Sequence, residues 1–158
     1  MKSLKRQIGR SLAIACVLGT VCAVSLPGGT AMKLTAVRIG VPESGQTVQL
    51  KGLEYIATSR NTFSVVVKDV RFDQTSDPGA DPVKGTWTFN AVNGEGKVHR
   101  IDISVVLEDA KHKRMASYNA FMLVLAGSEG QELEIPMKVK AKRWAETKSI
   151  LIQANFTS

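Results

Sequence analysis

The sequence predicts an all-β protein, an antiparallel β-sandwich of about seven to eight strands. Apolar residues recur with a period of two residues over most of the chain from Leu34 onward, which is the spacing of half-buried strands. Segments rich in Gly, Pro, Asn and Asp separate these runs at short intervals. Helical periodicity is scarce, since only 108–119 and 143–147 are compatible with a helix.

The clearest alternation of apolar and polar residues is the predicted strand that ends at Leu107. Every second residue from Ile101 to Leu107 is aliphatic, whereas Arg100, Asp102 and Ser104 fall on the opposite face of the same strand. Similar or shorter apolar runs predict strands over 34–39, 47–50, 63–67, 86–91, 121–125, 133–139 and 149–157. Strands of this kind each contribute one apolar face to a shared core.

The segments between these runs carry turn signals. Asn93-Gly94 lies between two alternating runs and predicts a β-hairpin. The segment 73–84 contains Pro78, Gly79 and Pro82, and it predicts a long exposed loop. Trp87 lies in an alternating run and is expected in the core.

The first 31 residues have the layout of a secretory signal peptide. Four basic residues precede an apolar run over 11–26, and small residues follow it up to Ala31. This run of 16 residues is shorter than the roughly 20 that cross a bilayer, although a retained N-terminal anchor is the alternative. We therefore expect a signal peptide over 1–31 and a β-sandwich domain over 32–158. The protein would be periplasmic or extracellular, with no membrane span after cleavage.

Cleavage after Ala31 changes the chemistry available to the domain. Both cysteines, Cys16 and Cys22, belong to the predicted signal peptide, so disulfides, thiolate nucleophiles and cysteine-based metal sites are excluded from the domain. The formal net charge falls from +7 to +3, because the removed segment holds four cations and no acid. Nucleic acid is accordingly an improbable partner.

The order of features over 91–139 resembles bacterial extracytoplasmic immunoglobulin-like domains of the FxLYD type. Asn93 lies in a turn that leads into an alternating strand, and this strand ends in a signature that Leu107 and Asp109 match. Val105 and Glu108 depart from the Phe and Tyr of the family pattern. The resemblance implies an immunoglobulin-like β-sandwich outside the cytoplasm, and it carries no catalytic residues.

A basic segment near the C-terminus is the candidate ligand-binding site. On a continuous strand, Lys138, Lys140 and Lys142 would project from one face about 7 Å apart and form a ridge for an anionic ligand. Arg143 and Trp144 would add a further cation and a stacking surface. The alternative is a solvated edge strand, whose lysines and nearby Pro136 prevent pairing with other chains.

Other polar groups suggest weaker hypotheses. The carboxylates of Asp69, Asp73, Asp77 and Asp81 could gather around Ca²⁺, but capping of turns is the commoner role, so no metal or cofactor is predicted. The two histidines, His99 and His112, are expected to be structural or surface residues. The neighbour of His99 two positions back is Lys97, so no carboxylate orients it from that side.

These features lead to one function and two alternatives. The leading hypothesis is an exported, non-enzymatic binding or structural module of the bacterial cell envelope, with a protein or an envelope polymer as partner. One alternative is a polyanion-binding protein that uses the basic strand 138–143. The other is a small hydrolase with a site assembled from loops, since such sites leave no linear trace. The sequence does not determine the oligomeric state, and no catalytic residue is predicted.

Overall fold

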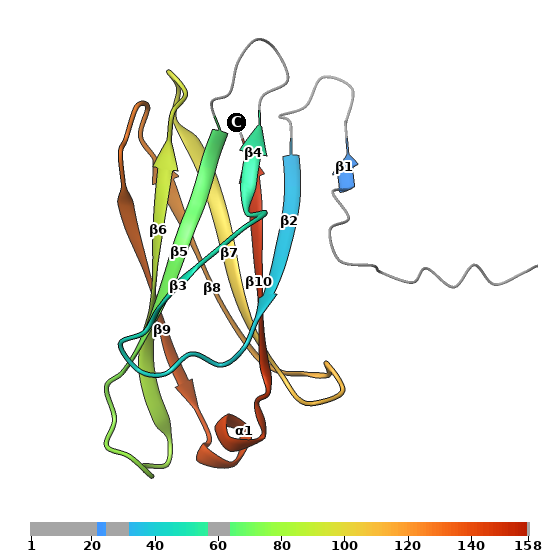
Figure 1. Ribbon diagram of the computed structural model, residues 1–158, viewed down its shortest axis with the longest axis vertical. Coiled ribbons are helices and arrows are strands. Elements are labelled where there is room, and N and C mark those ends of the chain that lie inside the picture. The colour runs from blue at the N-terminus through green and yellow to red at the C-terminus, as the bar shows by residue number, and fades with distance from the viewer. Residues whose placement is uncertain (1–21, 25–31, 57–63, 158) are drawn as a thin grey trace, which may run out of the picture.

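The computed structural model describes residues 22–24, 32–56 and 64–157, which form two antiparallel β-sheets around a common core (Figure 1). The first sheet has the strand order β1-β2-β10-β7-β8, and the second has the order β3-β5-β6-β9, with β4 also pairing with β5. The elements are β1 (Cys22–Val24), β2 (Met32–Ile39), β3 (Thr47–Gln49), β4 (Glu54–Ile56), β5 (Ser64–Gln74), β6 (Val83–Asn93), β7 (His99–Glu108), β8 (Arg114–Val124), β9 (Gln131–Val139), α1 (Ala141–Glu146) and β10 (Ser149–Thr157).

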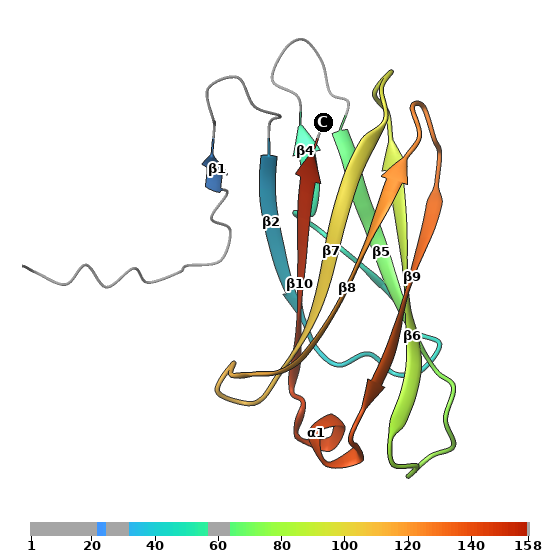
Figure 2. The same ribbon diagram turned by 180° about the vertical axis from the view of Figure 1, so that it is seen from behind.

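The predicted antiparallel β-sandwich is confirmed. Seven of the described strands have eight or more residues, and β1, β3 and β4 have three each. The view from behind shows β10, β7 and β8 of the first sheet in front of β5, β6 and β9 of the second (Figure 2). Most consecutive strands either pair within a sheet, as β5 with β6 and β7 with β8, or cross between the sheets, whereas β3 and β4 both pair with β5.

The core is built from the apolar faces that the alternation predicts. Ile101, Ile103, Val105 and Leu107 of β7 are all fully buried. The corresponding residues of β6 and β10 are fully buried as well. The burial follows the period of two because successive side chains on a strand point to opposite faces.

An aromatic stack lies where the core approaches α1. Trp87 is fully buried, as predicted, and its ring centroid is 4.6 Å from that of Phe72. The other neighbour of Phe72 is Trp144 of α1, at 5.0 Å. Gly85 lies directly beneath Phe72, and this close approach requires a residue without a side chain.

One expectation about local structure is wrong, and one segment compatible with either a helix or a loop is resolved. Asn93-Gly94 does not form a hairpin, because β6 and β7 belong to different sheets. The buried amide of Asn93 donates to the carbonyl oxygens of Lys97 and Val124, and these bonds hold a crossover loop instead of a tight turn. The segment 108–119 is not helical, since it contains the end of β7, a short loop and the start of β8. The loop expected over 73–84 is present as 75–82.

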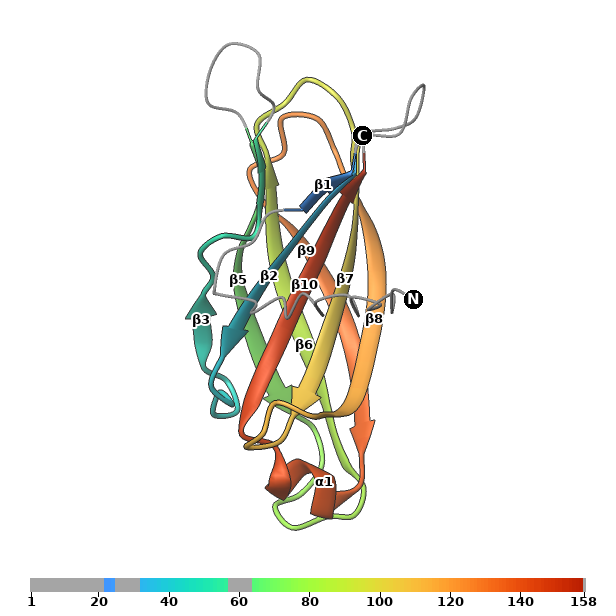
Figure 3. The same ribbon diagram turned by 90° about the vertical axis from the view of Figure 1, so that its right-hand side faces the viewer.

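One end of the sandwich carries α1 together with loops 75–82 and 109–113, and we name it the α1 end (Figure 3). Backbone contacts join these segments. The Lys148 N–H donates to the Glu108 carbonyl oxygen at 2.8 Å, and the Ala141 N–H donates to Asp81 Oδ1 at 3.1 Å. The α1 end therefore brings together three segments that are far apart in the sequence.

The predicted signal peptide, 1–31, lies outside the described residues except for β1. The three residues of β1 pair antiparallel with the first three residues of β2. None of the described residues belongs to a helix with the length and apolar character needed to cross a bilayer.

Candidate functional site at the α1 end

The basic segment predicted as the ligand site does not lie on one strand. Lys138 belongs to β9, but this strand ends at Val139, and Lys142, Arg143 and Trp144 belong to α1. Lys140 has an extended backbone and accepts the Trp144 N–H through its carbonyl oxygen at 3.0 Å, which begins the helix. The prediction of one strand face is therefore wrong for Lys142. The edge position of this strand is confirmed, because β9 lies at the end of its sheet.

The helix places these cations next to the beginning of β8. Arg143 Nη1 donates to the Met115 carbonyl oxygen at 3.3 Å, and the Tyr118 hydroxyl donates to the Lys138 carbonyl oxygen at 2.7 Å. Burial raises the pKa of Tyr118, and the nearby positive charge of Arg143 opposes that rise. These contacts connect the beginning of β8, which follows the basic residues 111–114 in the sequence, to the basic segment 138–143.

The register of β6 and β9 adds a further cation. Lys84 lies directly opposite Lys138 in this antiparallel pair, and both side chains are exposed. Like charges in directly opposite positions destabilise a sheet. Among the described residues, no ion pair within 4.0 Å includes either lysine. Lys84 could not be assigned to this site from the sequence, because the register between two distant strands cannot be read from a single strand.

Of the exposed cations at the α1 end, we define as the basic surface the six that lie on or next to the β6–β9 pair, on α1 and at the first residue of β8: Lys84, Arg114, Lys138, Lys140, Lys142 and Arg143. Acids also lie near this surface, including Glu134 on the same strand face as Lys138. Asp81 accepts the Ala141 N–H, and Glu146 approaches Lys142 only to 4.0 Å while both side chains are largely exposed. Asp109 accepts the Lys111 and Lys113 backbone N–H groups, and these hydrogen bonds lower its pKa.

A pocket of about 600 Å³ lies beside the basic surface. Its apolar wall includes Pro78, Val83 and Trp144, and its polar lining includes Ser44, Gln74 and Ser76. All ten residues that line it are uncharged. Trp144 packs against Phe72 with an angle of 41° between the rings, so the aromatic stack of the core fixes the position of the indole.

Hydrogen bonds hold the polar lining of this pocket in place. The Gln74 N–H donates to Ser44 Oγ at 2.9 Å, and the Lys84 N–H donates to Ser76 Oγ at 3.1 Å. The Gln74 side-chain amide donates to the Ser76 carbonyl oxygen at 3.1 Å. The pocket therefore combines an aromatic wall with neutral groups of fixed orientation, as small-molecule sites commonly do.

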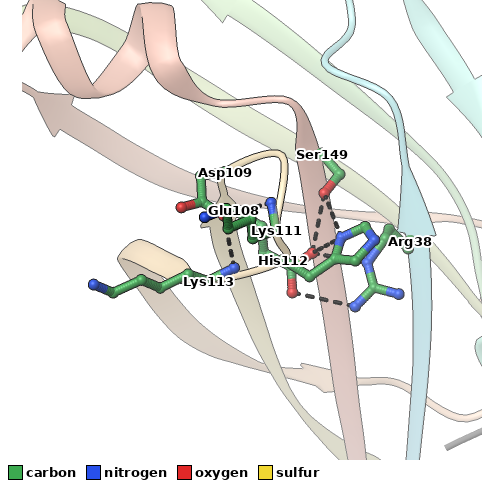
Figure 4. Close-up of polar contacts among 7 residues, drawn as sticks. All are labelled: Arg38, Glu108, Asp109, Lys111, His112, Lys113 and Ser149. Carbon is green, nitrogen blue, oxygen red and sulfur yellow. Dashed lines mark hydrogen bonds and ion pairs between the residues drawn. The ribbon is translucent and has the colours of Figure 1, made fainter.

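A polar cluster lies on the outer face of the first sheet at the α1 end (Figure 4). Arg38 of β2 binds the buried Glu108 carboxylate through two nitrogens, at 2.7 and 3.2 Å. Ser149 Oγ donates to Glu108 Oε2 at 3.0 Å. Burial by itself raises the pKa of Glu108, but hydrogen bonds from Arg38 and Ser149, with the nearby charges, leave it below its ordinary value.

This cluster contains Ser, His and Glu but does not have the geometry of a catalytic triad. His112 Nδ1 lies 3.4 Å from both Ser149 Oγ and Glu108 Oε2. In a triad the two imidazole nitrogens divide these roles, one toward the nucleophile and the other toward the acid. Here Ser149 donates to the carboxylate, and Arg38 compensates its charge. The cluster is therefore suited to joining β2, β7 and β10.

His99 and Asp73, two other polar groups considered from the sequence, also have structural partners. His99 is buried, and its Nε2 lies 2.5 Å from Glu95 Oε2, so a carboxylate four positions back orients the ring. The sequence analysis missed this partner because Glu95 lies in the crossover loop. Asp73 binds Arg71 at 2.8 Å. Among the described residues, no group of three or more His, Cys, Asp or Glu side chains could hold a metal ion.

No family model matches this chain, and comparison with curated proteins finds no match.

Proposed function

We propose that this protein is an exported, non-enzymatic β-sandwich module of the bacterial cell envelope, and that it binds an anionic polymer through the basic surface. The observation that carries the proposal is the direct opposition of Lys84 and Lys138 in the β6–β9 pair. A sheet selected only for stability would place an acid or a neutral residue at one of these positions. An anionic ligand between the two ammonium groups removes their repulsion.

The arrangement suits a polymer better than a single small anion. Lys138 and Lys140 are two residues apart on an extended backbone, which spaces their side chains by about 7 Å. Lys142 and Arg143 continue the surface on α1, and Arg114 extends it to β8. Successive anionic groups of a polymer can therefore be neutralised along one path.

Export is the part of the proposal that rests on the sequence. The basic residues, the apolar run over 11–26 and the small residues up to Ala31 support it. An exported domain meets anionic envelope polymers directly.

The test compares two triple variants on immobilised heparin, used as a model polyanion. Replacing Lys138, Lys140 and Lys142 by Gln should lower the salt concentration at which the protein elutes. The matched control replaces Lys51, Lys68 and Lys97, which are also exposed but lie outside the basic surface. Both variants lose the same formal charge, so a difference between them reports position.

We expect the control to elute near the wild type. Binding should also weaken steeply with salt, since each neutralised anionic group releases condensed counterions. Equal retention of the two triple variants would overturn the proposal, because it would show a response to net charge alone.

A further inference from the structure

We infer that the pocket beside the basic surface binds one saccharide ring, so that the anionic polymer is an acidic polysaccharide. This inference rests on the proposed function and specifies its ligand.

Trp144 supplies the first argument. Its ring packs on Phe72 at a centroid distance of 5.0 Å, so the indole is held in place before any ligand arrives. Together with Pro78 and Val83 it forms an apolar wall. A sugar ring presents a face of C–H groups that can pack on such a wall, and a fixed aromatic group loses little conformational freedom on binding.

The neutral polar lining supplies the second argument. Ser44, Ser76 and Gln74 offer hydroxyl and amide groups in a pocket that contains no charged side chain. A carboxylate, sulfate or phosphate inside it would lose hydration without an opposite charge to compensate. Sugar hydroxyls can donate and accept hydrogen bonds with these groups. The pocket volume of about 600 Å³ is within the range of small-molecule sites and admits a single ring.

The position of the cations connects the two parts of the site. Val83 lines the pocket and precedes Lys84, and Ala141 lines it between Lys140 and Lys142. The lining therefore adjoins cations in the sequence, as it also adjoins the acids Asp77, Asp81 and Glu146, and the inference places the acidic group of the same or the next sugar on the side of Lys140 and Lys142. Polyphosphate has only the charged groups, so it would use the basic surface without the pocket.

The experiment uses the full chain and its tryptophan fluorescence. The chain has two tryptophans, and Trp87 is fully buried, so Trp144 reports on the pocket. The probes are oligosaccharides of heparin, alginate and polygalacturonate, with inorganic polyphosphate as the anion that has no sugar. We expect at least one oligosaccharide to change the Trp144 emission, and polyphosphate to bind without that change.

A variant that fills the pocket separates this inference from the proposed function. Ala145→Leu should weaken oligosaccharide binding by about tenfold and leave polyphosphate binding unchanged. Its matched control is Ala126→Leu, which adds the same atoms at an exposed position of the β8–β9 loop. Thermal unfolding of the filled variant near the wild-type melting temperature shows that it is folded.

Two results would overturn the inference. One is polyphosphate binding with no change of Trp144 emission by any of the oligosaccharides. The other is equal oligosaccharide affinity of Ala145→Leu and wild type, while replacing Lys138, Lys140 and Lys142 by Gln weakens it. In both cases the basic surface would still bind polyanions. Failure of that triple variant to weaken polyphosphate binding would instead contradict the proposed function.

Discussion

Glu108 shows how a single buried charge depends on its partners. Its carboxylate accepts two hydrogen bonds from Arg38 and one from Ser149. Arg38→Gln would remove the opposite charge and leave the buried carboxylate poorly compensated, at a cost of about 1–3 kcal/mol in the free energy of unfolding. Urea unfolding at neutral pH measures this loss. Adding Glu108→Gln to the variant should recover part of it, and no recovery would contradict the charge argument.

The same carboxyl makes the stability dependent on pH. Because the pKa of Glu108 is lowered on folding from its ordinary value of 4.5, its contribution is complete above that pH and is lost as the pH falls through the folded-state pKa. We expect acidification from about pH 6 to about pH 3 to destabilise the wild type more steeply than Glu108→Gln. Urea unfolding of both proteins at each pH is the measurement, and parallel pH profiles would count against the assignment.

Gly85 shows how close packing determines a residue type. A Cβ at this position would lie 2.6 Å from Phe72 Cζ and 2.9 Å from the Asp73 carbonyl oxygen. Phe72 cannot move away easily, since it is packed between Trp87 and Trp144. Gly85→Ala should therefore cost about 1–3 kcal/mol through overpacking. Thermal unfolding measures the loss, and an unchanged melting temperature would show that the stack can adjust.

At the scale of elements, the sequence predicts the long strands, but for the short helix it shows only that 143–147, which overlaps α1, is compatible with a helix. Alternation identifies strands such as β7 because buried apolar residues recur at every second position several times along the ten residues of the strand. The six residues of α1 provide less than two helical turns, too few to show a period of 3.6 residues. The helix forms because tertiary contacts hold it, including the packing of Trp144 on Phe72.

The candidate site could be predicted only in part for the same reason. Lys138 to Trp144 are neighbours in the sequence, so their association is visible there. Strand register adds Lys84 to the basic surface, and contacts between distant segments add Arg114 and form the pocket. A local pattern carries no information about either.

The Lys84–Lys138 pair across β6 and β9 can be tested for a role in stability and for a role in binding separately. Lys84→Glu would place opposite charges directly across the sheet, which should raise the free energy of unfolding by about 0.2–1 kcal/mol. The same change should weaken heparin retention, because it reverses one charge of the basic surface. Chemical unfolding and heparin chromatography of the same preparation measure both effects. Retention that stays at the wild-type level would argue against a binding role for this pair.

At the scale of the whole molecule, the distribution of charge matters more than its sum. Among the described residues, the outer face of the first sheet includes the ion pairs Arg38–Glu108 and Arg100–Asp102, and within each pair the opposite charges compensate locally. The basic surface, by contrast, concentrates cations at the α1 end. A small net charge over 32–158 is therefore compatible with a local anion-binding surface.

The division of the chain into a signal peptide and a domain gives the last prediction. The described core cluster begins at Leu50, and β1 contributes only three cross-strand pairs with β2. At about 0.2–1 kcal/mol for each pair, loss of β1 should leave a domain of ordinary stability folded. We expect the exported protein to begin at Met32 and residues 32–158 to unfold cooperatively with heparin retention intact. N-terminal sequencing and thermal unfolding test the two parts separately. A chain that begins at Met1 after export would favour a retained anchor, whereas failure of 32–158 to fold would show that the N-terminal segment is part of the sandwich.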